Sequence, residues 1–243
     1  MKIDLITLQA VNNYGSVLQT FATQEFFREH GCEVRILNYK KDASISDGNP
    51  FKAAVKFPFR LVTQCLQPFD AFRREHLNIT GKLRTSMKDF ADYESDADAF
   101  CTGSDQVWNS WWNRGILPEL YLAFAPEGSY KFAFSASFGK TEIDAEEVAE
   151  TQKWIDGYRH ISVREDSAAK ILEEQYHYSR AVHVPDPTLC LSGNAWRGYV
   201  KTTNGGGGLR NLSPTSSSTA SMHKVKRQES SMLMPQNSHA KQV

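Results

Sequence analysis

The first forty residues alternate between strand and helix patterns, and this constrains the fold more than any other feature. The stretch 3–8 is short and apolar, and 33–39 alternates apolar and polar side chains. Between them, a turn cluster at 12–16 precedes apolar residues at helical spacing over 17–27, and Gly31 follows in a C-cap position. A strand, a helix and a strand in this order predict a βαβ unit, and hence a parallel sheet.

The alternation continues to about residue 200. We expect further strands at 97–101, 130–135, 160–163 and 181–184, helices at 144–155 and 166–176, and either a lid or a short strand at 120–124. An aromatic, basic and proline-punctuated stretch at 40–80 interrupts the pattern and predicts a helical insertion or flap, with its best helix at 69–76. The sequence therefore predicts a Rossmann-like α/β domain over residues 1–201.

Residues 202–243 differ in composition from the rest of the chain. They contain no Phe, Tyr or Trp, and they include a run of four glycines and a Ser/Thr-rich stretch. Such a segment buries too little apolar surface to offset the entropy lost on ordering. We therefore expect a low-complexity, disordered tail.

Charge and composition argue against several classes of function. Lys+Arg and Asp+Glu both count 28, and no apolar run approaches the roughly 18 residues of a membrane span. Neither a nucleic-acid partner nor an integral membrane segment is indicated. No cysteine pair has metal-ligand spacing, so no metal is predicted. The N-terminal apolar stretch is too short for a signal peptide and is interrupted by Asp4, which predicts a cytoplasmic protein.

Polar and small residues lie where predicted strands end, and ligands bind at that edge of open α/β sheets. Asn13, Tyr14 and Gly15 precede the first helix, whose free N–H groups suit a phosphate or a carboxylate. The alternative is a tight turn capped by Asn13 or Ser16.

A second polar turn, formed by Gly103, Ser104 and Asp105, follows the predicted strand at 97–101. Asp105 could accept a hydrogen bond from a sugar hydroxyl or act as a base. The alternative is that Ser104 or Asp105 caps a helix beginning at Gln106.

Three later strand ends offer further candidates. Ser137 lies in a small-residue exit, which lets a ligand approach the backbone. Arg164 could grip a carboxylate or phosphate in a bidentate fork, or simply form a surface pair with Glu165. Asp186 lies between two prolines that fix its direction, so it either orients a ligand or only makes the turn.

The order of these segments carries more information than any one of them. Asn-Tyr-Gly-Ser-Val-Leu-Gln (13–19), Gly-Ser-Asp-Gln-Val-Trp-Asn (103–109), Ser-Ala-Ser-Phe-Gly (135–139), Ser-Val-Arg-Glu (162–165) and Asp-Pro-Thr-Leu (186–189) occur in sequence. This arrangement resembles the polysaccharide pyruvyl transferase family, over residues 1 to about 197.

The resemblance implies the N-terminal half of a GT-B-like fold, in which two Rossmann-like domains face each other. It also implies transfer of a pyruvyl group from phosphoenolpyruvate, the donor substrate, to sugar hydroxyls of a cell-surface polysaccharide in exopolysaccharide biosynthesis. No further cofactor is implied. By similarity, Arg164 would bind the anionic donor, Asn13, Tyr14 and Gly15 would line the crevice, and Asp105 would face the acceptor or the donor and serve as the candidate catalytic residue.

The chain also departs from the family pattern. Family members continue into a second α/β domain with an Arg/His region, which we cannot match here beyond about residue 200. The sequence therefore favours a truncated transferase that is inactive as a single chain and self-associates through an exposed domain face. The alternatives are a non-catalytic remnant acting as a saccharide- or anion-binding module, and half of a sugar-nucleotide-dependent glycosyltransferase.

Overall fold

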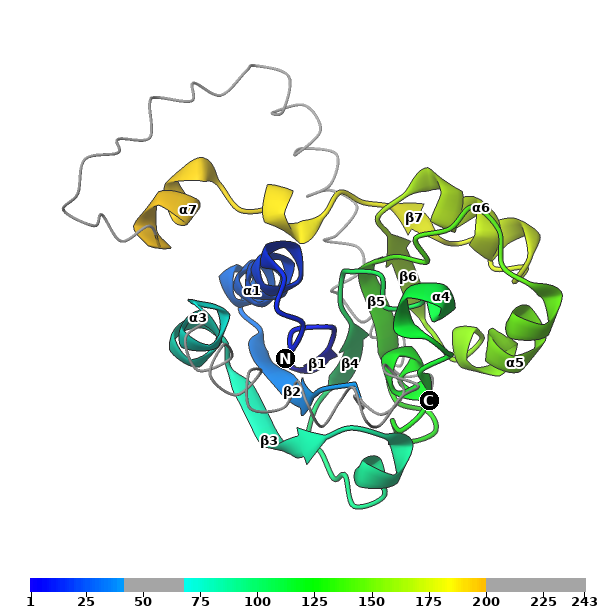
Figure 1. Cartoon of the computed structure of the whole chain (residues 1–243), viewed down its shortest axis with the longest axis horizontal. Coiled ribbons are helices and arrows are strands. Elements are labelled where there is room, and N and C mark those ends of the chain that lie inside the picture. Colours follow the sequence, from blue (N-terminus) through cyan, green and yellow to red (C-terminus); the bar gives the residue numbers. More distant parts are fainter. Residues whose placement is uncertain (42–67, 200–243) are drawn as a thin grey trace, which may run out of the picture. The chain divides into compact units, whose positions relative to one another are not determined.

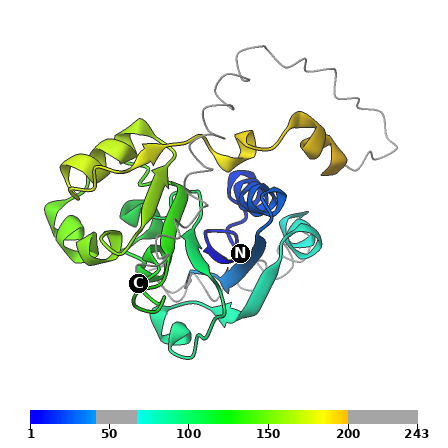
Figure 2. The ribbon, with the colours of Figure 1, turned by 180° about the vertical axis from the view of Figure 1, so that it is seen from behind.

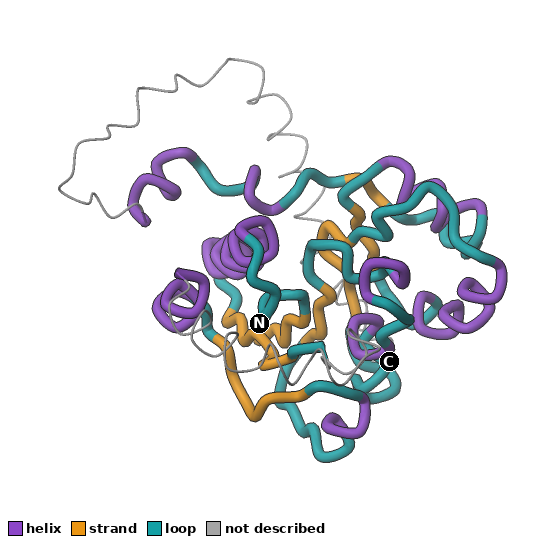
Figure 3. The backbone as a smooth tube through the Cα atoms, viewed as in Figure 1, coloured by secondary structure: helices purple, strands orange, loops and turns teal. Residues whose placement is uncertain are grey.

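A parallel β-sheet forms the centre of the protein in a computed structural model that describes residues 1–41 and 68–199. The chain divides into two compact units, Met1–Leu191 and Ser192–Val243, and the sheet belongs to the first. Its strands are β1 (Lys2–Ile6), β2 (Glu33–Tyr39), β3 (Ile79–Arg84), β4 (Ala99–Thr102), β5 (Lys131–Ala136), β6 (His160–Val163) and β7 (Val182–His183). They pair in the order β3-β2-β1-β4-β5-β6-β7, all parallel (Figures 1 and 3).

Helices connect the strands and cover the sheet. They are α1 (Tyr14–Glu29), α3 (Pro68–His76), α4 (Ser110–Asn113), α5 (Ala145–Ile155) and α6 (Asp166–Glu174), with short 3₁₀ turns η2 (Met87–Phe90), η3 (Pro118–Tyr121) and η4 (Pro187–Leu189). Right-handed crossovers that run in opposite directions from the sheet centre place α1 and α3 on one face, and α5 and α6 on the other (Figures 1 and 2). In the second unit, the described residues 192–199 contain α7 (Gly193–Tyr199).

Aromatic side chains fill the core beside the sheet. Phe26 and Phe27 of α1 pack against Phe134 of β5, with ring centroids 5.1 and 5.0 Å apart. A larger cluster contains the fully buried Trp108, whose ring centroid lies 5.1 Å from that of Phe138. Large aromatic side chains contribute most of the apolar area that such a core removes from water. This packing fixes the strand ends from which the polar turns emerge.

Most of the strands predicted from the sequence are confirmed, and so is the parallel α/β architecture. The ranges 33–39 and 160–163 coincide with β2 and β6, and the helix expected at 69–76 corresponds to α3. A strand at 120–124 is wrong, because this segment contains the end of η3 and a turn. The rest of the expected insertion, 42–67, and the tail at 202–243 lie outside the described residues.

The sequence pattern missed β3. This strand forms one edge of the sheet and pairs with β2 alone, so it carries three exposed residues in succession and lacks apolar alternation. Its central Gly81 has a φ of 79°, which also departs from regular strand geometry. The predicted insertion at 40–80 therefore extended into the sheet itself.

The strand order reverses direction on the two sides of β1. Leu5 of β1 pairs with Ile36 of β2 on one side and with Cys101 of β4 on the other. In open α/β sheets, ligands bind outside the carboxyl ends of the strands at this switch point. The turns that follow β1 and β4 therefore mark the most favourable place for a site.

In the described part of the chain, no helix has the length and apolarity needed to cross a membrane.

Candidate functional site

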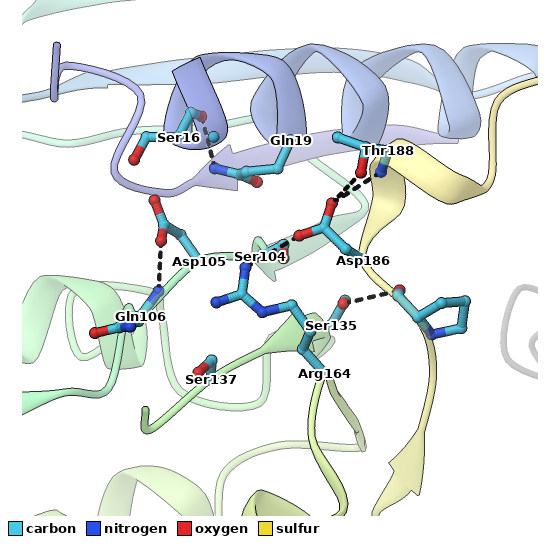
Figure 4. A network of polar contacts seen from close by, with 12 residues as sticks. Ser16, Gln19, Ser104, Asp105, Gln106, Ser135, Ser137, Arg164, Asp186 and Thr188 are labelled. Atoms are coloured by element: carbon cyan, nitrogen blue, oxygen red, sulfur yellow. Dashed lines mark hydrogen bonds and ion pairs between the residues drawn. The ribbon is translucent and has the colours of Figure 1, made fainter. Parts of the chain in front are cut away.

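A pocket of about 320 Å³ opens at this switch point. Its walls come from the turn before α1, the turn after β4, the end of β6, the turn after β7 and α4. The lining residues are Val11, Asn13, Gly15, Ser16, Asp105, Gln106, Trp112, Arg164, Asp186 and Thr188. Figure 4 shows the polar contacts among many of them. Segments far apart in the sequence thus converge on one cavity.

Asp105 is held in a strained conformation in this pocket. Its φ of 96° lies in the left-handed region, which is uncommon for a residue other than glycine. Oδ1 accepts a hydrogen bond from the backbone N–H of Gln106 at 2.8 Å, whereas Oδ2 is buried without a hydrogen-bond partner among the described residues. The carboxyl group points towards the first turn of α1, near Ser16 (Figure 4). Backbone strain combined with an unpaired buried carboxylate oxygen is a common feature of functional sites.

The alternative interpretation of Asp105 as a helix cap is wrong. No helix begins at Gln106; α4 begins at Ser110, and Asn109 is its N-cap. The side chain of Asn109 accepts a hydrogen bond from the backbone N–H of Trp112 at 3.0 Å. At the first turn, by contrast, the expected cap is confirmed, since Asn13 Oδ1 accepts from Gly15 N–H at 2.7 Å at the start of α1.

Arg164 extends from the end of β6 between two carboxylates. Its Nη1 donates to Asp186 Oδ2 at 3.0 Å (Figure 4). Its Nε donates to Glu165 Oε1 at 3.1 Å. Burial alone would lower the pKa of this guanidinium, but the hydrogen bonds and charges of both carboxylates outweigh it and raise the pKa. Arg164 is therefore a fixed cation whose orientation is set by Asp186 and Glu165.

Additional hydrogen bonds hold the carboxylates of Asp186 and Glu165 in place. Asp186 Oδ1 accepts from the backbone N–H of Thr188 at 3.0 Å and from its hydroxyl at 2.7 Å. Glu165 Oε1 also accepts from Ser137 Oγ at 2.9 Å. These contacts immobilise both partners of Arg164, which is the support that a preorganised binding group requires.

The structure brings together five of the nine site residues predicted from the sequence: Asn13, Gly15, Asp105, Arg164 and Asp186. The other four do not line the pocket. Tyr14 is 67% exposed, and its ring packs against Phe69 of α3, with 4.7 Å between ring centroids. Ser137 is buried, and its hydroxyl donates to Glu165, which in turn accepts from the lining residue Arg164.

Gly103 and Ser104 lie beneath the pocket. A Cβ on Gly103 would come within 3.0 Å of Leu5 Cδ1 and 3.1 Å of Thr7 Cβ, so this glycine allows the chain to pass close to β1. Ser104 is fully buried, and its carbonyl accepts a hydrogen bond from Thr7 Oγ1 at 2.6 Å. Both residues shape the turn that presents Asp105.

Sequence reasoning missed several pocket residues. Ser16, Gln106 and Thr188 lie inside the quoted motifs, so the motifs themselves were the signal that could have found them. Trp112 lies three residues beyond its motif, and nothing in the sequence distinguishes it from the adjacent Trp111. The direction of its side chain depends on the short helix α4.

The charges of the pocket combine one cation with two carboxylates. Arg164 and the first turn of α1 suit an anionic group, whereas the unpaired oxygen of Asp105 suits a hydroxyl donor. Arg164 is already paired with Asp186, so an anionic ligand must compete for it. Such a pocket can hold an anion beside a hydroxylated ligand.

Comparison with known proteins agrees with the motif order. The family model for polysaccharide pyruvyl transferase matches residues 13–233, which is most of the chain and extends beyond residue 197, where the resemblance by motifs ended. No curated protein and no solved structure matched the chain significantly. The chain belongs to the polysaccharide pyruvyl transferase family.

Proposed function

We propose that the pocket at the switch point binds phosphoenolpyruvate and the hydroxyl groups of a saccharide, and that the protein takes part in pyruvyl transfer to a cell-surface polysaccharide. One observation carries the proposal: residues from four separate motifs converge on a single pocket at the carboxyl edge of the sheet. The family to which the chain belongs supplies the reaction class.

The reaction sets clear chemical demands. Two sugar oxygens bond to C2 of phosphoenolpyruvate and the bond from C2 to the phosphate oxygen breaks, giving a ketal and inorganic phosphate. Of the two hydroxyl protons, one goes to the methylene carbon to form a methyl group and the other leaves with the phosphate. The site must therefore bind an anion, accept a hydroxyl proton and deliver a proton to carbon.

Arg164 and Asp105 fit two of these demands. Arg164 is fixed at the pocket wall and can pair with the carboxylate or phosphate of the donor, in place of Asp186. Asp105 offers a carboxylate oxygen without a hydrogen-bond partner in the described residues, which suits a sugar hydroxyl as donor. We assign donor binding to Arg164, and acceptor orientation or proton removal to Asp105.

Removing the Arg164 side chain tests the donor assignment. Because a hydrogen-bonded ion pair to the donor is lost, we expect Arg164→Ala to weaken phosphoenolpyruvate binding by roughly tenfold or more in isothermal titration calorimetry. Arg159→Ala is the matched control, since Arg159 is an exposed arginine just before the opposite end of β6. Equal binding of phosphoenolpyruvate by wild type and Arg164→Ala would remove Arg164 from the donor site.

A saccharide-binding module without catalysis is the second candidate function. The excess of carboxylates over guanidinium groups in the pocket favours neutral hydroxylated ligands over anions. This module would bind glycosides but release no phosphate from phosphoenolpyruvate in their presence. Phosphate release above the rate without protein, dependent on the glycoside, would exclude it.

A further inference from the structure

Trp112 is an exposed indole at the edge of the pocket. It lines the cavity, and 53% of its surface is exposed. The adjacent Trp111 is 77% exposed but is not part of the lining. Water-exposed tryptophan forgoes the free energy gained by burying a large aromatic side chain, so an exposed indole beside a polar pocket points to a ligand that covers it.

The turn that carries Trp112 is firmly held. Asn113 is buried, and its Nδ2 donates to the carbonyl oxygens of Gln106 at 3.0 Å and Val107 at 3.2 Å. The carbonyl of Asn113 in turn accepts from Lys41 Nζ at 2.9 Å. With Asn109 capping its start, α4 presents the indole from a fixed backbone. A preorganised aromatic surface loses little conformational entropy when a ligand binds.

The rest of the pocket shows what kind of ligand would cover this indole. Asp105 and Asp186 are hydrogen-bond acceptors, and Gln106 adds an amide. A pyranose ring presents C–H groups on one face and hydroxyls around its rim, so it can contact the indole and donate to the carboxylates together. A nucleotide would also stack, but Arg164 is the one guanidinium among the described lining residues, and the proposed function assigns it to phosphoenolpyruvate, so no cation is left for the phosphates of a nucleotide.

We propose that Trp112 is the stacking platform for a pyranose ring of the saccharide acceptor, and that it determines which sugar the pocket accepts. The proposal rests on the proposed function and adds the surface that holds the acceptor. The indole face contacts the C–H face of the ring, while a ring hydroxyl donates to Asp105. The contact orients the sugar relative to the donor and does not take part in bond formation.

The neighbouring tryptophans provide a matched test. Binding of methyl β-D-galactopyranoside and methyl α-D-mannopyranoside to the full chain is measured by saturation-transfer difference NMR, with phosphoenolpyruvate present. We expect Trp112→Ala to weaken glycoside binding about tenfold, because an aromatic contact is lost, and Trp111→Ala to change it by less than about twofold. Trp112→Phe keeps an aromatic ring and should restore part of the glycoside affinity. This restoration would show that the loss in Trp112→Ala does not come from misfolding.

The outcomes separate the platform from the proposed function. Phosphoenolpyruvate binding should be unchanged in Trp112→Ala. Equal glycoside affinities for the two alanine variants would overturn the platform alone. A wild-type protein that binds phosphoenolpyruvate but no glycoside would overturn the platform and the saccharide part of the proposed function. A wild-type protein that binds neither phosphoenolpyruvate nor glycoside would overturn the proposed function as well.

Discussion

Asp105 shows how one residue can combine strain with availability for a ligand. A non-glycine residue with a φ of 96° costs about 1–3 kcal/mol, and the buried Oδ2 adds a desolvation cost. Evolution could remove both costs with a glycine at this position. That an aspartate stands there agrees with a role at the ligand, since such strain persists mainly where function requires it.

Replacing Asp105 separates strain from side-chain loss. Glycine tolerates positive φ whereas alanine does not, so we expect Asp105→Gly to be about 1 kcal/mol more stable to unfolding than Asp105→Ala. Urea denaturation of the two variants measures the difference. Both should lose glycoside binding if Asp105 accepts the sugar hydroxyl. An alanine variant at least as stable as the glycine variant would mean that the backbone is not strained.

At the scale of elements, the site depends on turns that pack on one another after β4 and β5. Gly139 follows β5 with a φ of 59°, and a Cβ there would lie 2.6 Å from Asn109 Nδ2 and 2.8 Å from Gln106 Cδ. This close approach packs the small residues at the end of β5 (135–139) against the segment that follows β4 (103–109). Gln106 lines the pocket, so its position depends on the absence of a side chain at Gly139.

Gly139→Ala should therefore disturb both stability and binding. Gly128 is the matched control, since its φ is 77° but a Cβ there would meet nothing within 4 Å. Both substitutions introduce backbone strain, and only the first adds a clash, so we expect Gly139→Ala to be destabilised by about 1–3 kcal/mol more than Gly128→Ala. Thermal unfolding measures this difference, and equal melting temperatures would contradict the close packing.

The sequence predicted the strands best where burial leaves an apolar pattern. The range 160–163 matched β6, whereas β3 was missed because an edge strand need not be apolar. The predicted strand ends identified where a site would form, but they did not show which side chains point into that site. Tyr14, between two pocket residues, turns towards α3, because successive side chains on a helix point in different directions. Trp112 could be recognised as a pocket residue only once the orientation of α4 was known.

At the scale of the whole molecule, pH affects stability through buried carboxyl groups. Glu119 lies in η3 and is only 4% exposed. Burial raises the pKa of its carboxyl group, against hydrogen bonds that lower it. The folded protein therefore binds the proton more tightly than the unfolded chain does, so this group's contribution to stability falls as pH rises through the raised pKa.

Glu119→Gln removes this titration. We expect the variant to gain stability relative to wild type at pH 8 and to lose most of that advantage at pH 4, where the carboxyl group is mostly protonated in both states. Chemical denaturation at the two pH values measures the change. Glu146→Gln, at an exposed position of α5, is the control for the substitution itself. A constant difference between Glu119→Gln and wild type would contradict the burial argument.

The central claim is that the pocket at the switch point supports pyruvyl transfer. The most direct measurement incubates the purified chain with phosphoenolpyruvate and a galactosyl or mannosyl oligosaccharide, then follows ketal formation by mass spectrometry together with phosphate release. We predict one phosphate released for each ketal formed, and loss of both products in Arg164→Ala but not in Arg159→Ala. Phosphate and ketal formed at equal rates by wild type and Arg164→Ala, or no ketal from a wild-type protein that binds both substrates, would contradict the claim.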